Sequence, residues 1–134
     1  MGRANLKVYG LVTLIAGETD KDADDRRDHF DKGVDIECLD DIALGYNLNP
    51  NIKDVSPGSL RLAAGREKRS AVAPGAFVGS YASIAKRIAQ VVTDCELDGI
   101  ILIVPDYVND LQAVAKKTLA RMSEYGVSCR VGGA

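Results

Sequence analysis

The segment from Gly75 to Val104 constrains the fold more than any other, because it holds a strand, a helix and a second strand in immediate succession. A short apolar run ends in Gly79-Ser80, and an apolar stripe with helical spacing begins directly after it. Five consecutive apolar residues follow at 100–104, as is typical of a strand covered on both faces. Two strands joined by a helix pair in parallel, so the segment predicts a βαβ unit.

A further strand and helix are expected before this unit. Residues 7–16 are nearly continuous apolar and β-prone. Thr19 and Asp22 have the spacing of a capping box, which predicts a helix start at about Asp20, and Gly33 allows a break. The predicted elements are a strand at 7–16, helices within 20–46, a loop at 47–75, a strand at 76–79, a helix at 81–95, a strand at 99–104 and a helix at 107–125.

Residue types and apolar spacing also predict the caps and the core faces of the last two helices. Ser80 is expected to cap the helix at 81–95, Asp106 or Asn109 the last helix, and Gly126 to end it. The expected core faces are the stripes Ile84, Ile88, Val91, Val92, Cys95 and Val108, Leu111, Ala115, Leu119, Met122.

The long stretch at 45–74 is rich in glycine, proline and asparagine, which favours an irregular insertion with one short helix around 59–64. Its basic run, residues 66–69, is interpreted as part of a solvated loop rather than an anion site. After the last helix, residues 127–131 are β-prone and could supply one more strand.

Length and composition narrow the class of protein. The 134 residues fit a single α/β domain, with 46% hydrophobic and 27% charged residues and a net charge of −2. This charge gives no field that attracts nucleic acid, and no apolar run is long enough for a membrane helix. We expect a cytoplasmic protein whose three cysteines are reduced. With one histidine and no Cys-x-x-Cys pair, no metal site is expected.

Three sequence motifs, at residues 8–20, 77–83 and 98–102, carry a family resemblance that extends from about residue 7 to about residue 122. In their order and spacing the chain resembles the bacterial-luciferase-like flavin-dependent monooxygenases, and most of all the branch with the pyrimidine (uracil-ring-opening) monooxygenase. The resemblance implies a (β/α)8 barrel, reduced FMN with molecular oxygen, and a separate flavin reductase.

The resemblance also implies an incomplete barrel. Aligned by these motifs, the chain looks like strands 6, 7 and 8 of the family's barrel with their helices. A whole barrel needs about 250 residues. The implied function is the C-terminal portion of an FMN-dependent monooxygenase that is inactive alone. The alternative is a non-enzymatic module that forms homo-oligomers or docks on a missing N-terminal barrel portion. A self-contained flavodoxin-like sheet is a weaker alternative.

Barrel enzymes carry their functional residues where the strands end, which selects five candidates. Gly79 and Ser80 could receive a phosphate or flavin oxygen at the helix start, although capping is the favoured interpretation for Ser80. Glu18 and Asp106 are candidate acid or base groups, and Tyr107 could join them at a substrate pocket rim. The favoured alternatives are a helix-dipole partner for Glu18 and a cap for Asp106.

Overall fold

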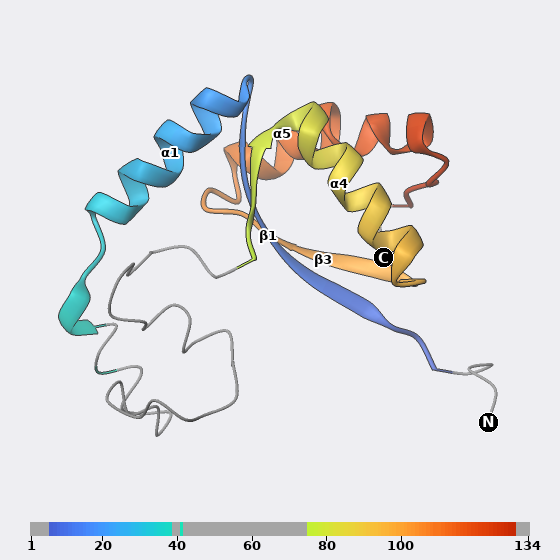
Figure 1. The fold of residues 1–134 in the computed structure, drawn as a ribbon, viewed down its shortest axis with the longest axis horizontal. Coiled ribbons are helices and arrows are strands. Elements are labelled where there is room, and N and C mark those ends of the chain that lie inside the picture. Colours follow the sequence, from blue (N-terminus) through green and yellow to red (C-terminus); the bar gives the residue numbers. More distant parts are fainter. Residues whose placement is uncertain (1–5, 39–40, 42–74, 131–134) are drawn as a thin grey trace.

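Figure 1 shows the computed structural model, which describes residues 6–38, 41 and 75–130. The predictions for residues 42–74, including the loop, the short helix and the basic run, lie outside the described residues.

The described elements alternate between strands and helices. They are β1 (Tyr9–Gly17), α1 (Asp20–Lys32), β2 (Phe77–Ser80), α4 (Tyr81–Asp94), β3 (Gly99–Ile103), α5 (Asn109–Lys117) and the 3-10 helix η1 (Leu119–Tyr125). Residues 36–38 and 41 are also helical. Each strand begins and ends within two residues of its predicted range. The single helix expected over 107–125 is divided, because α5 ends at Lys117 and the 3-10 helix η1 follows after Thr118.

Local capping chemistry explains where the helices begin. Thr19 and Asp22 form the reciprocal capping box at the start of α1. The Ser80 hydroxyl accepts a hydrogen bond from the Ser83 amide at the start of α4. Gly126 has φ 77°, a left-handed conformation that costs glycine little, and its amide donates to the Ser123 carbonyl oxygen at 3.1 Å as η1 ends.

The three strands form one parallel sheet, so the predicted α/β class is confirmed. The carboxyl half of β1, Leu14 to Gly17, pairs with β2 from Phe77 to Ser80. Its amino half, Tyr9 to Thr13, pairs with all of β3.

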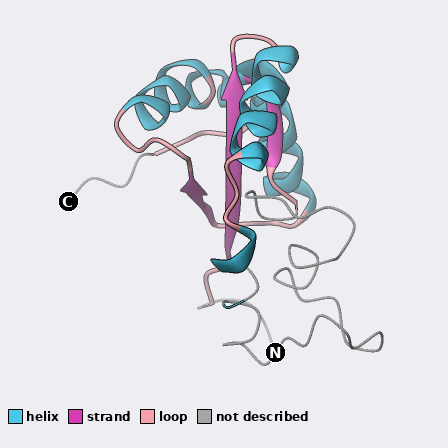
Figure 2. Cartoon of the chain, turned by 90° about the vertical axis from the view of Figure 1, so that its left-hand side faces the viewer, coloured by secondary structure: helices cyan, strands magenta, loops and turns pink. Residues whose placement is uncertain are grey.

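The strand order is β2-β1-β3, which puts the first strand in the middle of the sheet, as Figure 2 shows. Three consecutive barrel strands would have the second one in the middle. The described order therefore differs from the one that the family resemblance implies, and it is the order in which a flavodoxin-like sheet begins. Two right-handed crossovers in opposite directions need helices on opposite faces. Figure 1 shows α1 on one side of β1 and α4 and α5 on the other.

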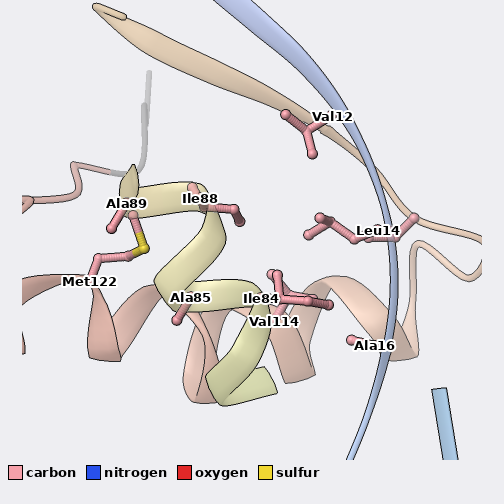
Figure 3. Close-up of a cluster of buried hydrophobic side chains, with 10 residues drawn as sticks. Val12, Leu14, Ala16, Ile84, Ala85, Ile88, Ala89, Val114 and Met122 are labelled. Atoms are coloured by element: carbon pink, nitrogen blue, oxygen red, sulfur yellow. The ribbon is translucent and has the colours of Figure 1, made fainter. Parts of the chain in front are cut away.

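The main core lies between β1 and the helices α4, α5 and η1. Figure 3 shows Val12 and Leu14 of β1 directed toward Ile84 and Ile88 of α4. The buried cluster comprises Val12, Leu14, Ala16, Ile84, Ala85, Ile88, Ala89, Val104, Val114 and Met122. The predicted stripe of α4 is therefore correct at its amino end, whereas Cys95 is exposed.

The predicted core face of the last helix is correct at Leu119 and Met122 and wrong at its amino end. Val108 and Leu111 are exposed, and the buried positions instead recur every four residues at Asp110, Val114, Thr118 and Met122. Asp110 is held by an arginine described below, and the Thr118 hydroxyl donates to the Tyr81 carbonyl oxygen at 3.2 Å. Polar residues thus occupy two positions of the buried face because each has a hydrogen-bond partner.

The opposite face of the sheet is covered only in part. Ile15 and Ala23 are fully buried where α1 contacts β1. Towards the other end of the sheet, Tyr9, Leu11 and Ile101 are 60%, 66% and 56% exposed. Leu11 and Ile101 are direct cross-strand neighbours, so they form a continuous apolar surface.

The remaining expectations concern the tail and the membrane. Residues 127–130 form no strand; Val127 instead packs against the main core. Among the helices that the structure describes, none is long and apolar enough to cross a membrane.

Two leucines on opposite faces of β1 test this packing. Leu14→Ala should lower the free energy of unfolding by about 2–5 kcal/mol, because Leu14 is 1% exposed and its removal leaves a cavity. Leu11→Ala, on the exposed face, should change it by no more than about 0.5 kcal/mol. Urea unfolding followed by circular dichroism measures both, and equal losses would contradict the described faces.

Candidate functional site

The carboxyl ends of β1 and β2 lie side by side, because Gly17 pairs with Ser80. This brings the first residue of α1, Asp20, to the start of α4. The Ser80 amide donates to the Asp20 Oδ1 atom at 2.6 Å. Hydrogen bonds from the Ser80 amide, and then from the Ser80 and Ser83 side chains, hold the pKa of Asp20 below its ordinary value of 3.8.

Gly79 and Ser80 are therefore committed to contacts within the chain. The Ser80 hydroxyl accepts from the Ser83 amide at 3.3 Å and lies 2.9 Å from the Ser83 hydroxyl. Gly79 has φ +157°, and a Cβ there would lie 3.2 Å from the Asp20 carboxylate. The capping interpretation of Ser80 is confirmed.

At the start of α4, a carboxylate of the chain itself takes one of the amides that could receive an anion. A helix start attracts anions through its free amides and positive dipole end. Here the Asp20 carboxylate already takes the Ser80 amide, and its negative charge repels a second anion.

Glu18, the first rim candidate, is an exposed ion-pair partner. Its carboxylate pairs with the Lys117 ammonium group of α5, and both side chains are largely solvated. The same ammonium lies 5.0 Å from the centre of the Tyr81 ring. The hydrogen bond with Glu18 raises the pKa of Lys117. Glu18 thus joins the end of β1 to α5.

Asp106 shapes the turn before α5. Its Oδ1 atom accepts from the amides of Val108 and Asn109 at 2.9 and 3.0 Å, and its Oδ2 atom from the Asn109 side chain at 2.7 Å. The hydrogen bond from the Asn109 backbone amide is the main cause that lowers the pKa of Asp106. A general acid needs a raised carboxyl pKa, so this environment favours a structural role in the turn, whereas α5 itself begins after Val108 without a side-chain cap. Tyr107 beside it is 61% exposed.

The ion pair between α1 and α5 at the end of β1 could not be predicted from sequence. The Arg26 guanidinium of α1 donates to both carboxylate oxygens of Asp110 at 2.9 and 2.8 Å, and to the Ala16 carbonyl oxygen at 2.6 Å. Asp110 also accepts from the Asp106 amide at 3.1 Å. The hydrogen bond with Asp110 raises the pKa of Arg26. Arg26 looks like one more solvated charge on a polar helix, and only the fold pairs it with Asp110.

The possible metal ligands and the cysteines of the described residues bear on whether the chain holds a metal site or a reactive thiol. The described residues include no group of three or more histidine, cysteine or acidic side chains that could hold a metal ion. Cys38, Cys95 and Cys129 are free and exposed. Partial desolvation raises the pKa of the Cys129 thiol, which disfavours the reactive thiolate.

Comparison with known proteins gives relatives of one kind. No family model matches the chain. It is 31% identical over 112 residues to the pyrimidine monooxygenase RutA of Klebsiella pneumoniae, a match that covers 81% of this chain and 30% of that protein. The RutA proteins of Escherichia coli and Methylorubrum populi are 30% and 28% identical over 107 and 109 residues. The chain spans about 30% of the length of the curated relatives it matches.

The parallel βα units make the chain an α/β protein. The matches make it a homologue of luciferase-like monooxygenases, the family that its sequence motifs resemble. The particular relatives are the pyrimidine monooxygenases, and the chain is a homologue of a segment of them.

A carboxyl titration tests the contact at the start of α4. The ¹³C shift of the Asp20 carboxyl should titrate with a midpoint below 3.8, because the Ser80 amide stabilises the ionised form. Because the pKa of Asp20 is lower in the folded than in the unfolded chain, its stabilisation is complete above the unfolded pKa and is lost as the pH falls through the folded pKa. Asp20→Asn should remove this part of the acid dependence of unfolding. A midpoint at or above 3.8 would contradict the contact.

Proposed function

We propose that the chain is the C-terminal portion of a reduced-FMN-dependent monooxygenase that oxidises a small organic substrate such as a pyrimidine, and that it is inactive alone. The observation that carries the proposal is the similarity to pyrimidine monooxygenases over 81% of the chain. A flavin reductase partner and a cytoplasmic location belong to the same proposal.

The share of the relatives that is matched supports a segment of about three βα units, which the family resemblance puts at strands 6–8 of a barrel. Three of eight βα units make up somewhat more than a third of a barrel, and the match covers 30% of the relative. Along the chain, the strand–Gly–Ser–helix junction at β2 is followed by the all-apolar β3, as the family resemblance implies, although β1 and not β2 is the central strand of the described sheet.

The local contacts support the absence of activity in the isolated chain. Glu18 and Asp106 are held by Lys117 and by the turn before α5, and Asp20 takes the Ser80 amide at the start of α4. A flavin enzyme needs the protein to orient the cofactor and exclude water. The exposed strand ends that carry Glu18 and Tyr107 offer no such enclosure.

Titration with FMN tests the proposal for this chain. Flavin absorbance and fluorescence should change linearly with added FMN, without saturation in the micromolar range, because the described strand ends of the isolated chain do not enclose a cofactor. Saturable micromolar binding with a spectral shift would contradict it.

The same proposal predicts a gain of binding in the context of a relative. A Klebsiella pneumoniae pyrimidine monooxygenase whose aligned segment is replaced by residues 7–122 of this chain should bind FMN. A chimera with native-like circular dichroism and no FMN binding would count against a monooxygenase origin.

A second candidate function, an oligomerisation module, is favoured by the exposed apolar surface of Tyr9, Leu11 and Ile101. A contiguous exposed apolar surface tends to be covered by a partner, here a second copy of the chain. Light scattering should then show an oligomer that Leu11→Thr with Ile101→Thr converts to a monomer. A wild-type monomer at high concentration would rule this function out.

A further inference from the structure

The turn before β3 is bound to the residue before β1 by a reciprocal pair of hydrogen bonds. The Asp98 amide donates to the Val8 carbonyl oxygen at 2.9 Å, and the Val8 amide donates to the Asp98 Oδ2 atom at 2.9 Å. The Lys7 ammonium adds a contact of 2.8 Å to the Oδ1 atom. Hydrogen bonds to a charged group are stronger than neutral ones, so Asp98 fixes where β3 begins relative to β1.

Close packing fixes the same pair of strands. A Cβ on Gly99 would lie 2.6 Å from the Tyr9 ring, so the ring covers the start of β3 only because residue 99 is glycine. A Cβ on Gly10 would lie 2.8 Å from a terminal methyl group of Leu97. The space left at Gly99 of β3 is therefore filled by Tyr9 of β1, and the space left at Gly10 of β1 by Leu97 from the turn before β3.

We propose that Asp98 latches β3 onto β1, and that β3 thereby occupies the edge of β1 at which a preceding barrel strand would have to pair. In a barrel every strand lies between its two neighbours in sequence. The edge of β1 that does not hold β2 would then belong to the strand before β1. In this chain it holds β3 along Tyr9–Thr13.

Among the described residues, the latch gives a three-stranded sheet with β1 in its centre rather than a sector of a barrel. β3 must leave β1 and pair with β2 before a preceding strand can join the sheet. This consequence rests on the proposed function, whereas the latch itself rests only on the contacts of Asp98, Gly99 and Tyr9. The FMN titration can therefore fail without any effect on the latch.

Paired cysteines test which strand β3 lies beside. Leu11→Cys with Ile101→Cys joins direct neighbours on the exposed face, and adjacent strands lie about 4.8 Å apart, within reach of a disulfide. Val78→Cys with Ile101→Cys, or with Ile103→Cys, joins β2 to β3 across β1, beyond disulfide reach at about twice that spacing. The full chain is used, with Cys38, Cys95 and Cys129 replaced by serine.

The readout is the fraction oxidised in a glutathione redox buffer, measured by mass spectrometry. The 11/101 pair should be almost fully oxidised under conditions that leave both β2–β3 pairs reduced. Preferential oxidation of a β2–β3 pair would overturn the proposal.

A charge-matched pair of variants tests the latch. Asp98→Ala should lower the effective concentration of the 11/101 thiol pair several-fold, because β3 loses its charged anchor on Val8 and Lys7. Asp94→Ala removes the same charge four residues earlier and should leave it unchanged. Circular dichroism confirms that both variants fold, and equal values for the two would overturn the role of Asp98.

Discussion

Pairing along both edges of β1 is the constraint on which the rest of the structure depends. β2 pairs with its carboxyl half and β3 with its amino half, so neither outer strand contacts the sheet except through β1. The same strand directs Val12, Leu14 and Ala16 into the main core and buries Ile15 on the other face. Loss of β1 would leave β2 and β3 as isolated strands, which are marginal in water.

The arrangement around β1 also decides what the strand ends can do. Because β1 and β2 end together, Asp20 reaches the Ser80 amide and supplies an anion from within the chain. Because α1 and α5 both reach the end of β1, Arg26 pairs with Asp110 there. Ser80, Glu18 and Asp106 thus have structural partners within this chain, and its likeness to pyrimidine monooxygenases covers a segment of those proteins.

The local elements could be predicted from sequence, because each depends on residues that are neighbours in the chain. Apolar runs placed the strands, and Thr19 and Ser80 marked two helix starts. The strand order could not be predicted in this way, since a run such as 100–104 does not specify which edge it joins. The family resemblance suggested the order of a barrel, whereas Asp98 and Gly99 fit β3 to β1.

The buried face of α5 was missed for a related reason. Apolar periodicity selected Val108 and Leu111, yet Asp110 and Thr118 are buried because Arg26 and the Tyr81 carbonyl satisfy them. Such partners lie 37 or more residues away and leave no periodic signal. The candidate site shows the same limit, because the identity of Asp20 does not reveal that it meets Ser80 from 60 residues away.

The most direct test of a central β1 is a set of backbone nuclear Overhauser effects measured on the isotopically labelled chain. The structure predicts cross-strand effects between residues 9–13 and 99–103 and between 14–17 and 77–80, with none between 77–80 and 99–103. Effects that join 77–80 directly to 99–103, without those between 9–13 and 99–103, would show a barrel-like order and contradict the account.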